Sequence, residues 1–378
     1  MNKNDRDLAL ASSTSVSKVE PSPKKKRKVL NEITIIRALA CLSIVMLHST
    51  TFTVNYAQEG ILVTTLATIL CFGTPTFVFI SGLILAYSYP NKLPKGFYWK
   101  RIKLILFPFI FMAIFYAVFS GRAVPEQIPS LIWNNLTGGY HGWFVLVIFQ
   151  FYVLHHLFTK FFYKLPAALV LSISLIINVA YLSIFNFIQP TSYTPFTSYL
   201  WSGGYYIPFV AWLFYFSLSY YCGKNFMTFV ESLKRFKALI FFFLIVSLGV
   251  LIYNNVNEYL AVGSKRIDII FFTVMMILFL LLVCQSLKKT PKILTIVSQY
   301  SFGIYLAHWF YLTIIRDFIA SQGWKLGYMQ IPVLFVSALI SCIITITILN
   351  RFPFGKYMIG KINRKKQTPV KKETVVTG

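Results

Sequence analysis

The sequence predicts an all-α integral membrane protein with about ten transmembrane helices and both termini in the cytoplasm. Of its 378 residues, 57% are hydrophobic and only 12% are charged, whereas about a quarter of the residues of soluble domains are charged. Apolar stretches long enough to cross a bilayer recur along the chain. Lys and Arg lie between these stretches and at the two ends. Lipid is therefore the expected solvent for most of the chain.

Each apolar stretch is a candidate transmembrane helix, because a helix pairs its own backbone polar groups, as the bilayer interior requires. Pro75 is expected to kink the second helix. The stretches cover approximately residues 33–53, 63–87, 103–120, 143–160, 166–187, 205–222, 237–254, 267–285, 296–315 and 330–350.

The positions of the basic residues predict the orientation. If the N-terminus is inside, the inner segments hold 30 Lys and Arg, against five in the outer loops, namely Arg122, Lys265, Arg266, Arg316 and Lys325. Because positively charged loops stay in the cytoplasm, this split predicts cytoplasmic termini and an even number of helices. Residues 1–29 are then a disordered basic tail, 30–352 a membrane domain and 353–378 a second basic tail.

The net charge of +25 does not indicate nucleic-acid binding, because the basic residues follow the membrane pattern. The segment at 23–29 has the form of a nuclear-import signal. An apolar helix begins within about five residues of it, which favours a cytoplasmic anchor instead. The five cysteines lie within or beside apolar stretches, without CxxC or the Cys/His spacing of zinc sites. We expect no nucleic-acid partner, no disulfide and no metal.

The first predicted helix contains two ionisable residues, Arg37 and His48, which are costly within a bilayer. They are eleven positions apart, so they project from one helix face about 16 to 17 Å apart along the axis. A guanidinium near the cytoplasm can bind phosphate, and a deeper imidazole can accept a proton from an attacking hydroxyl. The alternative is that Arg37 extends to the lipid headgroups and His48 forms one interhelical hydrogen bond.

The pair of Arg37 and His48 resembles the signature of the membrane acyltransferase-3 family. Other segments follow in the order that this family shows. The aromatic segment 77–82 ends in Ser-Gly. The basic cluster Lys100, Arg101 and Lys103 departs from the family pattern, since two lysines stand where arginines are usual and Lys103 is out of register.

Two further segments complete the resemblance, which spans about residues 30 to 350. His141-Gly142-Trp143-Phe144 is similar to the family's His-x-Trp-aromatic motif. Residues 298–308 resemble a Ser-Tyr-x-x-Tyr-Leu-x-His pattern that contains Ser301, Tyr305 and His308. An interhelical hydrogen bond is an alternative role for His308.

The resemblance implies that acyl-CoA, with acetyl-CoA expected, is the donor and that a cell-envelope glycan is the acceptor. Arg37, Arg101, Lys100 and Lys103 would bind the donor, and His48 and His308 would be catalytic. His141, Trp143, Ser301 and Tyr305 would bind the acceptor. Direct transfer and a covalent acyl-histidine both remain open.

The resemblance also implies location and partners. The protein is expected in a bacterial plasma membrane, in contact with lipid and with polysaccharide synthase or export proteins. The acceptor could be an exopolysaccharide, including poly-N-acetylglucosamine, a capsule or peptidoglycan. The alternative function is a transporter or flippase for a polysaccharide or lipid-linked sugar, although charged residues deep in the helices are few.

Overall fold

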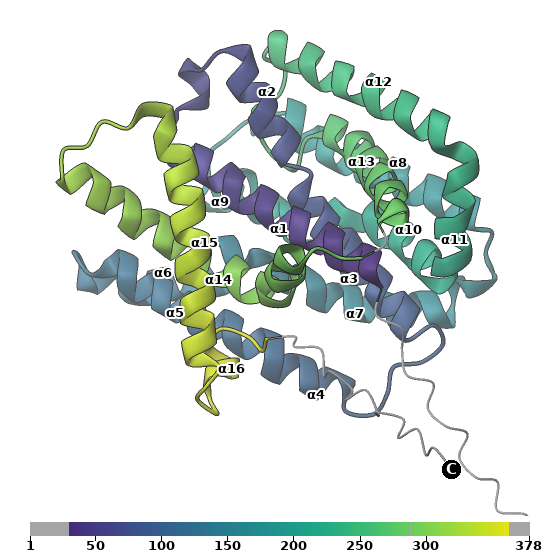
Figure 1. Cartoon of the computed structure of the whole chain (residues 1–378), viewed down its shortest axis with the longest axis horizontal. Helices are drawn as coiled ribbons and strands as arrows, with labels where there is room; N and C mark the ends of the chain where they lie inside the picture. The colour runs from purple at the N-terminus through teal and green to yellow at the C-terminus, as the bar shows by residue number, and fades with distance from the viewer. Residues whose placement is uncertain (1–29, 288, 363–378) are drawn as a thin grey trace, which may run out of the picture. The chain divides into compact units, whose positions relative to one another are not determined.

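The computed structural model describes residues 30–287 and 289–362, in which every regular element is helical (Figure 1). The prediction of an all-α fold is therefore confirmed. The predicted tail at 1–29 lies outside the described residues, as does 363–378 of the second tail.

The helices coincide with the predicted apolar stretches, with several short additions. Their bounds are α1 (Asn31–Thr51), α2 (Ile61–Leu70), α3 (Gly73–Ser88), α4 (Phe97–Arg101), α5 (Phe107–Gly121), α6 (Ile128–Leu136), α7 (Phe144–Lys160), α8 (Ala167–Phe187), α9 (Pro195–Ser202), α10 (Leu213–Lys224), α11 (Phe226–Ser232), α12 (Lys237–Val256), α13 (Ile267–Ser286), α14 (Lys292–Ser321), α15 (Gln330–Leu349) and α16 (Gly355–Met358).

Eight helical segments among the described residues are long and apolar enough to cross a membrane. They are Asn31–Thr51, Ile61–Ser88, Phe97–Gly121, Pro125–Lys160, Ala167–Phe187, Phe226–Val256, Ile267–Ser286 and Gly327–Leu349. The chain is thus a multi-pass membrane protein. Helices α10 and α14 are outside this set, so the count of ten helices and the cytoplasmic termini remain predictions.

The second predicted helix is divided into α2 and α3 by a turn at Cys71 and Phe72. Pro75 has no amide hydrogen to donate to the carbonyl of Cys71, four residues earlier. The expected kink therefore occurs as a break one turn before the proline.

Helix α6 occupies a segment that sequence analysis assigned to an outer loop. It packs against α5, and the side chain of Asn135 donates a hydrogen bond of 2.9 Å to the carbonyl of Ala113. The chain then passes through a turn at His141–Trp143 into α7. This hairpin brings the segment that contains His141 against α5 and α14.

Helix α1 lies in the middle of the bundle and packs against α2, α3, α13, α14 and α15 (Figure 1). Helix α3, which packs against α1, also packs closely against α10. A Cβ atom added to Gly223 would lie 2.5 Å from the carbonyl oxygen of Leu83, and one added to Gly82 would lie 2.0 Å from the Ser219 hydroxyl. Small residues of this kind let membrane helices approach closely.

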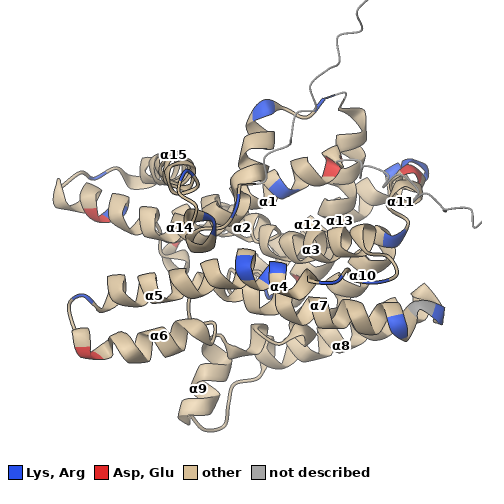
Figure 2. Ribbon diagram, turned by 90° about the horizontal axis from the view of Figure 1, so that it is seen from below, with Lys and Arg blue, Asp and Glu red and all other residues tan. Residues whose placement is uncertain are grey.

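Charged residues lie mainly in loops and at helix ends (Figure 2). Helix α4 and the beginning of α1 are places where basic residues enter the bundle (Figure 2). The structure therefore brings Lys100 and Arg101 to the same region as Arg37, although the sequence separates them by more than 60 residues.

Candidate active site

One cavity of about 1550 Å³ lies within the bundle, and nine of the ten predicted site residues line it. Its wall is formed by residues of α1, α3, α4, α5, α7 and α14 and by the loop between α12 and α13. The nine are Arg37, His48, Lys100, Arg101, His141, Trp143, Ser301, Tyr305 and His308. Arg37 and His48 therefore face one cavity, as the helical spacing predicts.

Basic side chains line this cavity. Arg37 comes from α1 and Arg101 from α4, and Lys95, Lys100 and Lys361 line the same cavity. The Arg101 guanidinium lies 5.0 Å from the ring centre of Phe97 and 5.6 Å from that of Tyr152. Among residues 30–287 and 289–362, no carboxylate forms an ion pair with these five side chains. The group can therefore accept a polyanion.

The local backbone explains how α4 presents these cations. Between α4 and α5 the chain forms a π-type turn at Ile102–Leu106, where the amide of Phe107 bonds the carbonyl of Ile102. Such a wider turn rotates the residues before it relative to those after it, and π-type turns are frequent at functional sites. Lys103 lies within this turn and does not line the cavity; its ammonium is 4.8 Å from the ring centre of Trp99.

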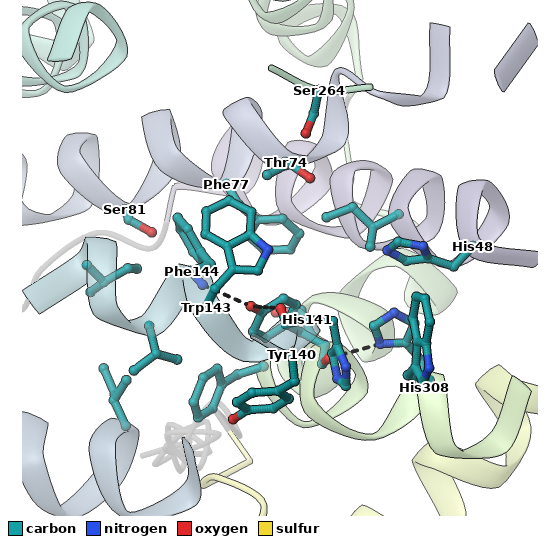
Figure 3. A pocket seen from close by; sticks show the side chains of 18 of the residues that line it. His48, Thr74, Phe77, Ser81, Tyr140, His141, Trp143, Phe144, Ser264 and His308 are labelled. Atoms are coloured by element: carbon teal, nitrogen blue, oxygen red, sulfur yellow. Dashed lines mark hydrogen bonds between the residues drawn. The ribbon is translucent and has the colours of Figure 1, made fainter. Parts of the chain in front are cut away.

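Three histidines meet in the cavity (Figure 3). The ring of His308 is 5.3 Å from that of His48 and 5.1 Å from that of His141, measured between ring centres. Trp309 contacts the other two, at 5.1 Å from His48 and 5.8 Å from His141. The sequence separation of these residues is large, so only the fold reveals that they form one group.

The hydrogen bonds of His308 define which nitrogen carries its proton. Nδ1 lies 3.0 Å from the carbonyl oxygen of Ile304 and 2.9 Å from that of Tyr305. Carbonyl oxygens only accept hydrogen bonds, so Nδ1 carries the hydrogen and Nε2 has a free lone pair when the ring is neutral. Nε2 is buried and has no partner among the described residues. It is available to accept a proton from a bound hydroxyl.

His141 has the opposite arrangement. Its Nε2 lies 3.1 Å from the carbonyl oxygen of Leu306, so Nε2 carries the hydrogen of the neutral ring and Nδ1 has the lone pair. The side chain of His48 forms no hydrogen bond within the described part of the chain, which leaves both ring nitrogens for a substrate or for a water molecule.

Two tyrosines hold this group in place. The hydroxyl of Tyr116 donates to the carbonyl of Leu306 at 3.0 Å and accepts from the amide of Phe310 at 3.0 Å. It thereby joins α5 to α14 within one turn of His308. The hydroxyl of Tyr305 accepts from the amide of Phe144 at 3.2 Å and donates to the carbonyl of His141. The two phenols fix His141 and α14 relative to each other.

Aromatic and polar side chains cover the rest of the wall. Trp143 is stacked on Trp212 at 5.6 Å and lies 4.7 Å from Tyr206, measured between ring centres. One face of the Trp143 ring, which is predicted to bind the acceptor, is thus occupied by protein. Ser301 lines the cavity, and its hydroxyl donates to the carbonyl of Ser298 at 3.0 Å.

Sequence analysis missed several lining residues, including Tyr116, Trp309, Lys265, Lys95 and Lys361. Tyr116 and Trp309 lie in aromatic-rich helices, where nothing in the spacing distinguishes a lining residue from a packed one. Lys265 was counted as an outer-loop residue only. The one signal in the sequence that Lys265 lines the cavity was its position directly before an apolar stretch and beside a second cation, Arg266.

Cations and imidazole bases that line the same cavity suit transfer from a large anionic donor to a hydroxyl. The comparisons agree with this class of chemistry. The profile of the family described as "Acyltransferase domain" matches residues 30–350. The chain therefore belongs to the acyltransferase-3 family, and it is a multi-pass bacterial membrane acyltransferase.

Individual relatives refine this comparison. The chain is 34% identical over 358 residues to a protein of Bacillus subtilis (strain 168) named as a membrane-bound acyltransferase, YfiQ, with 90% of this chain and 97% of that protein covered. It is 26% identical over 348 residues to a protein of Staphylococcus aureus (strain N315) named as a poly-beta-1,6-N-acetyl-D-glucosamine export protein, with 89% and 97% covered. A protein of the same name from Staphylococcus epidermidis is 25% identical over 357 residues, with 91% and 97% covered. No solved structure matches the chain.

Proposed function

We propose that the protein transfers an acyl group, with acetyl expected, from cytoplasmic acyl-CoA to a hydroxyl of an extracytoplasmic glycan. The observation that carries this proposal is that Arg37, Arg101, His48 and His308 line one cavity. Cations and bases that share one space can act on opposite ends of one elongated donor.

The dimensions of α1 fit such a donor. Arg37 and His48 are separated by about 16 to 17 Å along the helix axis, and the cavity volume of about 1550 Å³ leaves room for more than one ligand. The nucleotide phosphates of acyl-CoA would lie against Arg37 and Arg101, because guanidinium groups bind phosphate in a bidentate manner. The pantetheine arm would then reach the histidines.

The histidines would carry out the transfer as general bases. Nε2 of His308 or a nitrogen of His48 takes the proton of the acceptor hydroxyl while its oxygen attacks the thioester carbonyl carbon. The carbon–sulfur bond breaks, the thiolate of CoA takes the proton from the imidazolium, and the products are a glycan ester and CoA. The free lone pair on Nε2 of His308 can act as the base of this direct route or as a nucleophile that forms an acyl-histidine, so both routes stay open.

The acceptor is proposed to be a cell-envelope polysaccharide. The Staphylococcus relatives are named for export of poly-beta-1,6-N-acetyl-D-glucosamine, and aromatic side chains suited to sugars line the cavity at Tyr140, Trp143 and Tyr206. Mass spectrometry of envelope glycans from cells with and without this protein tests the acceptor. Ester groups that depend on the protein support the proposal, and identical glycans from both strains contradict it.

Export is the second candidate function. It is favoured by the relatives' names and by lining residues near both ends of α1, such as Arg37 and Tyr56. The two functions can be distinguished with purified protein reconstituted in lipid vesicles. An acyltransferase consumes acetyl-CoA only when an acceptor is present. An exporter moves glycan into vesicles without consuming acetyl-CoA.

A further inference from the structure

Lys265 places a positive charge inside the cavity that no carboxylate among the described residues neutralises. Its ammonium lies 4.1 Å from the ring centre of Tyr206 and 5.3 Å from that of Trp143. Within the described ranges, no carboxylate forms an ion pair with Lys265, although it lines the same cavity as the histidines. The aromatic faces stabilise the cation partly, but the ammonium keeps hydrogen-bond donors that no described residue accepts.

The neighbouring cation shows the contrast. Arg266 is almost fully buried and forms an ion pair of 2.6 Å with Asp268. It also donates to the side chain of Asn255 at 2.5 Å and to the carbonyl of Leu260 at 3.2 Å. A buried arginine that is paired in this way serves the fold.

The Arg266 network also orients Lys265. Asn186 of α8 donates to the backbone carbonyl of Lys265 at 3.1 Å and accepts from the amide of Ile267 at 3.3 Å. Asn254 of α12 donates to Asp268 at 2.8 Å. Both sides of the loop are therefore fixed to neighbouring helices, so the side chain of Lys265 is held toward the cavity.

Burial makes this ammonium costly without a counter-charge. Removal from water lowers the pKa of Lys265 to about 8, because desolvation disfavours the charged form. A buried charge is normally paired. Since the described residues supply no partner, a ligand is the remaining source of negative charge.

We propose that Lys265, Trp143 and Tyr206 form a subsite that binds an acidic group, a carboxylate or a phosphate, on the acceptor glycan. The sugar ring would pack against the aromatic side chains while its oxyanion pairs with the ammonium. This inference rests on the proposed function and goes beyond it, because it assigns a charge to the acceptor. The donor's own phosphates have Arg37 and Arg101.

The test uses two acceptors that differ only in the acidic group. A tetrasaccharide that contains glucuronate and its carboxyl-reduced form are compared in the purified protein in lipid nanodiscs with acetyl-CoA. We expect wild-type kcat/KM to favour the acidic form at least about tenfold, which is the effect of one charged hydrogen bond. Lys265→Gln should bring the ratio close to one, and Lys265→Arg should largely keep it. The matched control is Lys325→Gln, which removes an exposed lysine outside the cavity.

A second pair of acceptors distinguishes the source of the charge. A phosphorylated tetrasaccharide and its dephosphorylated form show whether the subsite prefers phosphate to carboxylate. A preference in either pair that Lys265→Gln removes supports the subsite and names its ligand. The absence of any preference in wild type, or a preference that Lys265→Gln retains, overturns it. If Lys265→Gln lowers the transfer rate only with acyl donors that end in a carboxylate, the group that pairs with Lys265 belongs to the donor. That result would also overturn the proposed acceptor subsite.

The pH dependence of the preference for acidic acceptors gives an independent test of the subsite. The amine loses its proton as the pH rises through about 8, so the wild-type preference should decline above that pH and persist in Lys265→Arg. The other titratable or charged groups near Lys265 belong to His48, Cys71, Tyr206, Arg266 and Asp268. All five are present in both proteins, so the difference between the two pH profiles reports on residue 265. Identical profiles would contradict the proposal.

Binding of the same tetrasaccharides, followed by tryptophan fluorescence, separates this proposal from the proposed function. If the protein transfers no acyl group but still binds the acidic form more tightly through Lys265, the subsite stands and the transfer reaction is wrong. If the protein transfers acyl groups without regard to acceptor charge, the reaction stands and the subsite is wrong.

Discussion

His308 is the residue whose environment most clearly defines a chemical role. Both carbonyl groups near Nδ1 belong to its own helix, so the tautomer follows from local geometry. The sequence predicted His308 as catalytic only through a family resemblance. Its free Nε2 could not be predicted, because it depends on which side chains the other helices bring near it.

The role of His308 predicts the behaviour of His308→Asn. The asparagine amide can keep the donor to the helix carbonyls but has no basic nitrogen at the Nε2 position. We expect kcat to fall by roughly 10² to 10⁴ while the protein remains folded. The measurement is steady-state acetyl transfer in nanodiscs. His155→Gln is the comparison, because His155 is a buried histidine that does not line the cavity. Equal rates for His308→Asn and wild type would contradict the role.

Arg37 is expected to act on the donor's nucleotide. Arg37→Gln should raise the KM for acetyl-CoA by roughly tenfold or more, since a charged hydrogen bond to phosphate is lost. The KM for acetyl-pantetheine, which has no nucleotide phosphates, should not change. Lys103→Gln provides the comparison, because Lys103 does not line the cavity. An equal rise for both donors would show that Arg37 acts in another way.

At the scale of elements, α5 and α14 are joined by the Tyr116 hydroxyl. Tyr116→Phe removes both hydrogen bonds but keeps the ring, so α14 should shift near His141 and His308. We expect kcat to fall about tenfold to a hundredfold with little change in KM, since misplaced catalytic groups slow the chemical step. A lower melting temperature with unchanged kcat would show that Tyr116 serves only the fold.

The contact between α3 and α10 depends on a glycine. In Gly223→Ala the new Cβ would lie 2.5 Å from the backbone carbonyl oxygen of Leu83, so the two helices must separate. Overpacking of this kind costs about 1 to 3 kcal/mol. Thermal unfolding in detergent measures it. Gly249→Ala is the matched control, because no atom lies within 4 Å of its Cβ position; equal melting temperatures for both variants would refute the close contact.

The sequence predicted the long apolar helices well because each one has a local signal. It missed α6 because a nine-residue helix is too short to span a bilayer and its segment contains polar residues. It also placed the beginning of α10 several residues early, since the apolar stretch continues across Pro208, where the α-helix has not yet begun. Short helices of this kind depend on tertiary packing.

At the scale of the whole molecule, one cavity unites residues of α1, α3, α4, α5, α7 and α14, some of which are far apart in the sequence. The match to the family at residues 30–350 agrees with the extent of the predicted resemblance. Arg37 and His48 could be paired from helical spacing alone. The convergence of His48, His141 and His308 could not, because contacts between distant helices leave no periodic pattern in the sequence.

The central claim is that one cavity holds the acyl-CoA phosphates and delivers the thioester to the histidines. It is tested most directly by His48→Ala in purified protein, with CoA affinity and acyl transfer measured on the same sample. The account predicts unchanged CoA affinity together with a loss of acyl transfer of at least about a hundredfold. Transfer at the wild-type rate in a folded His48→Ala protein would contradict it.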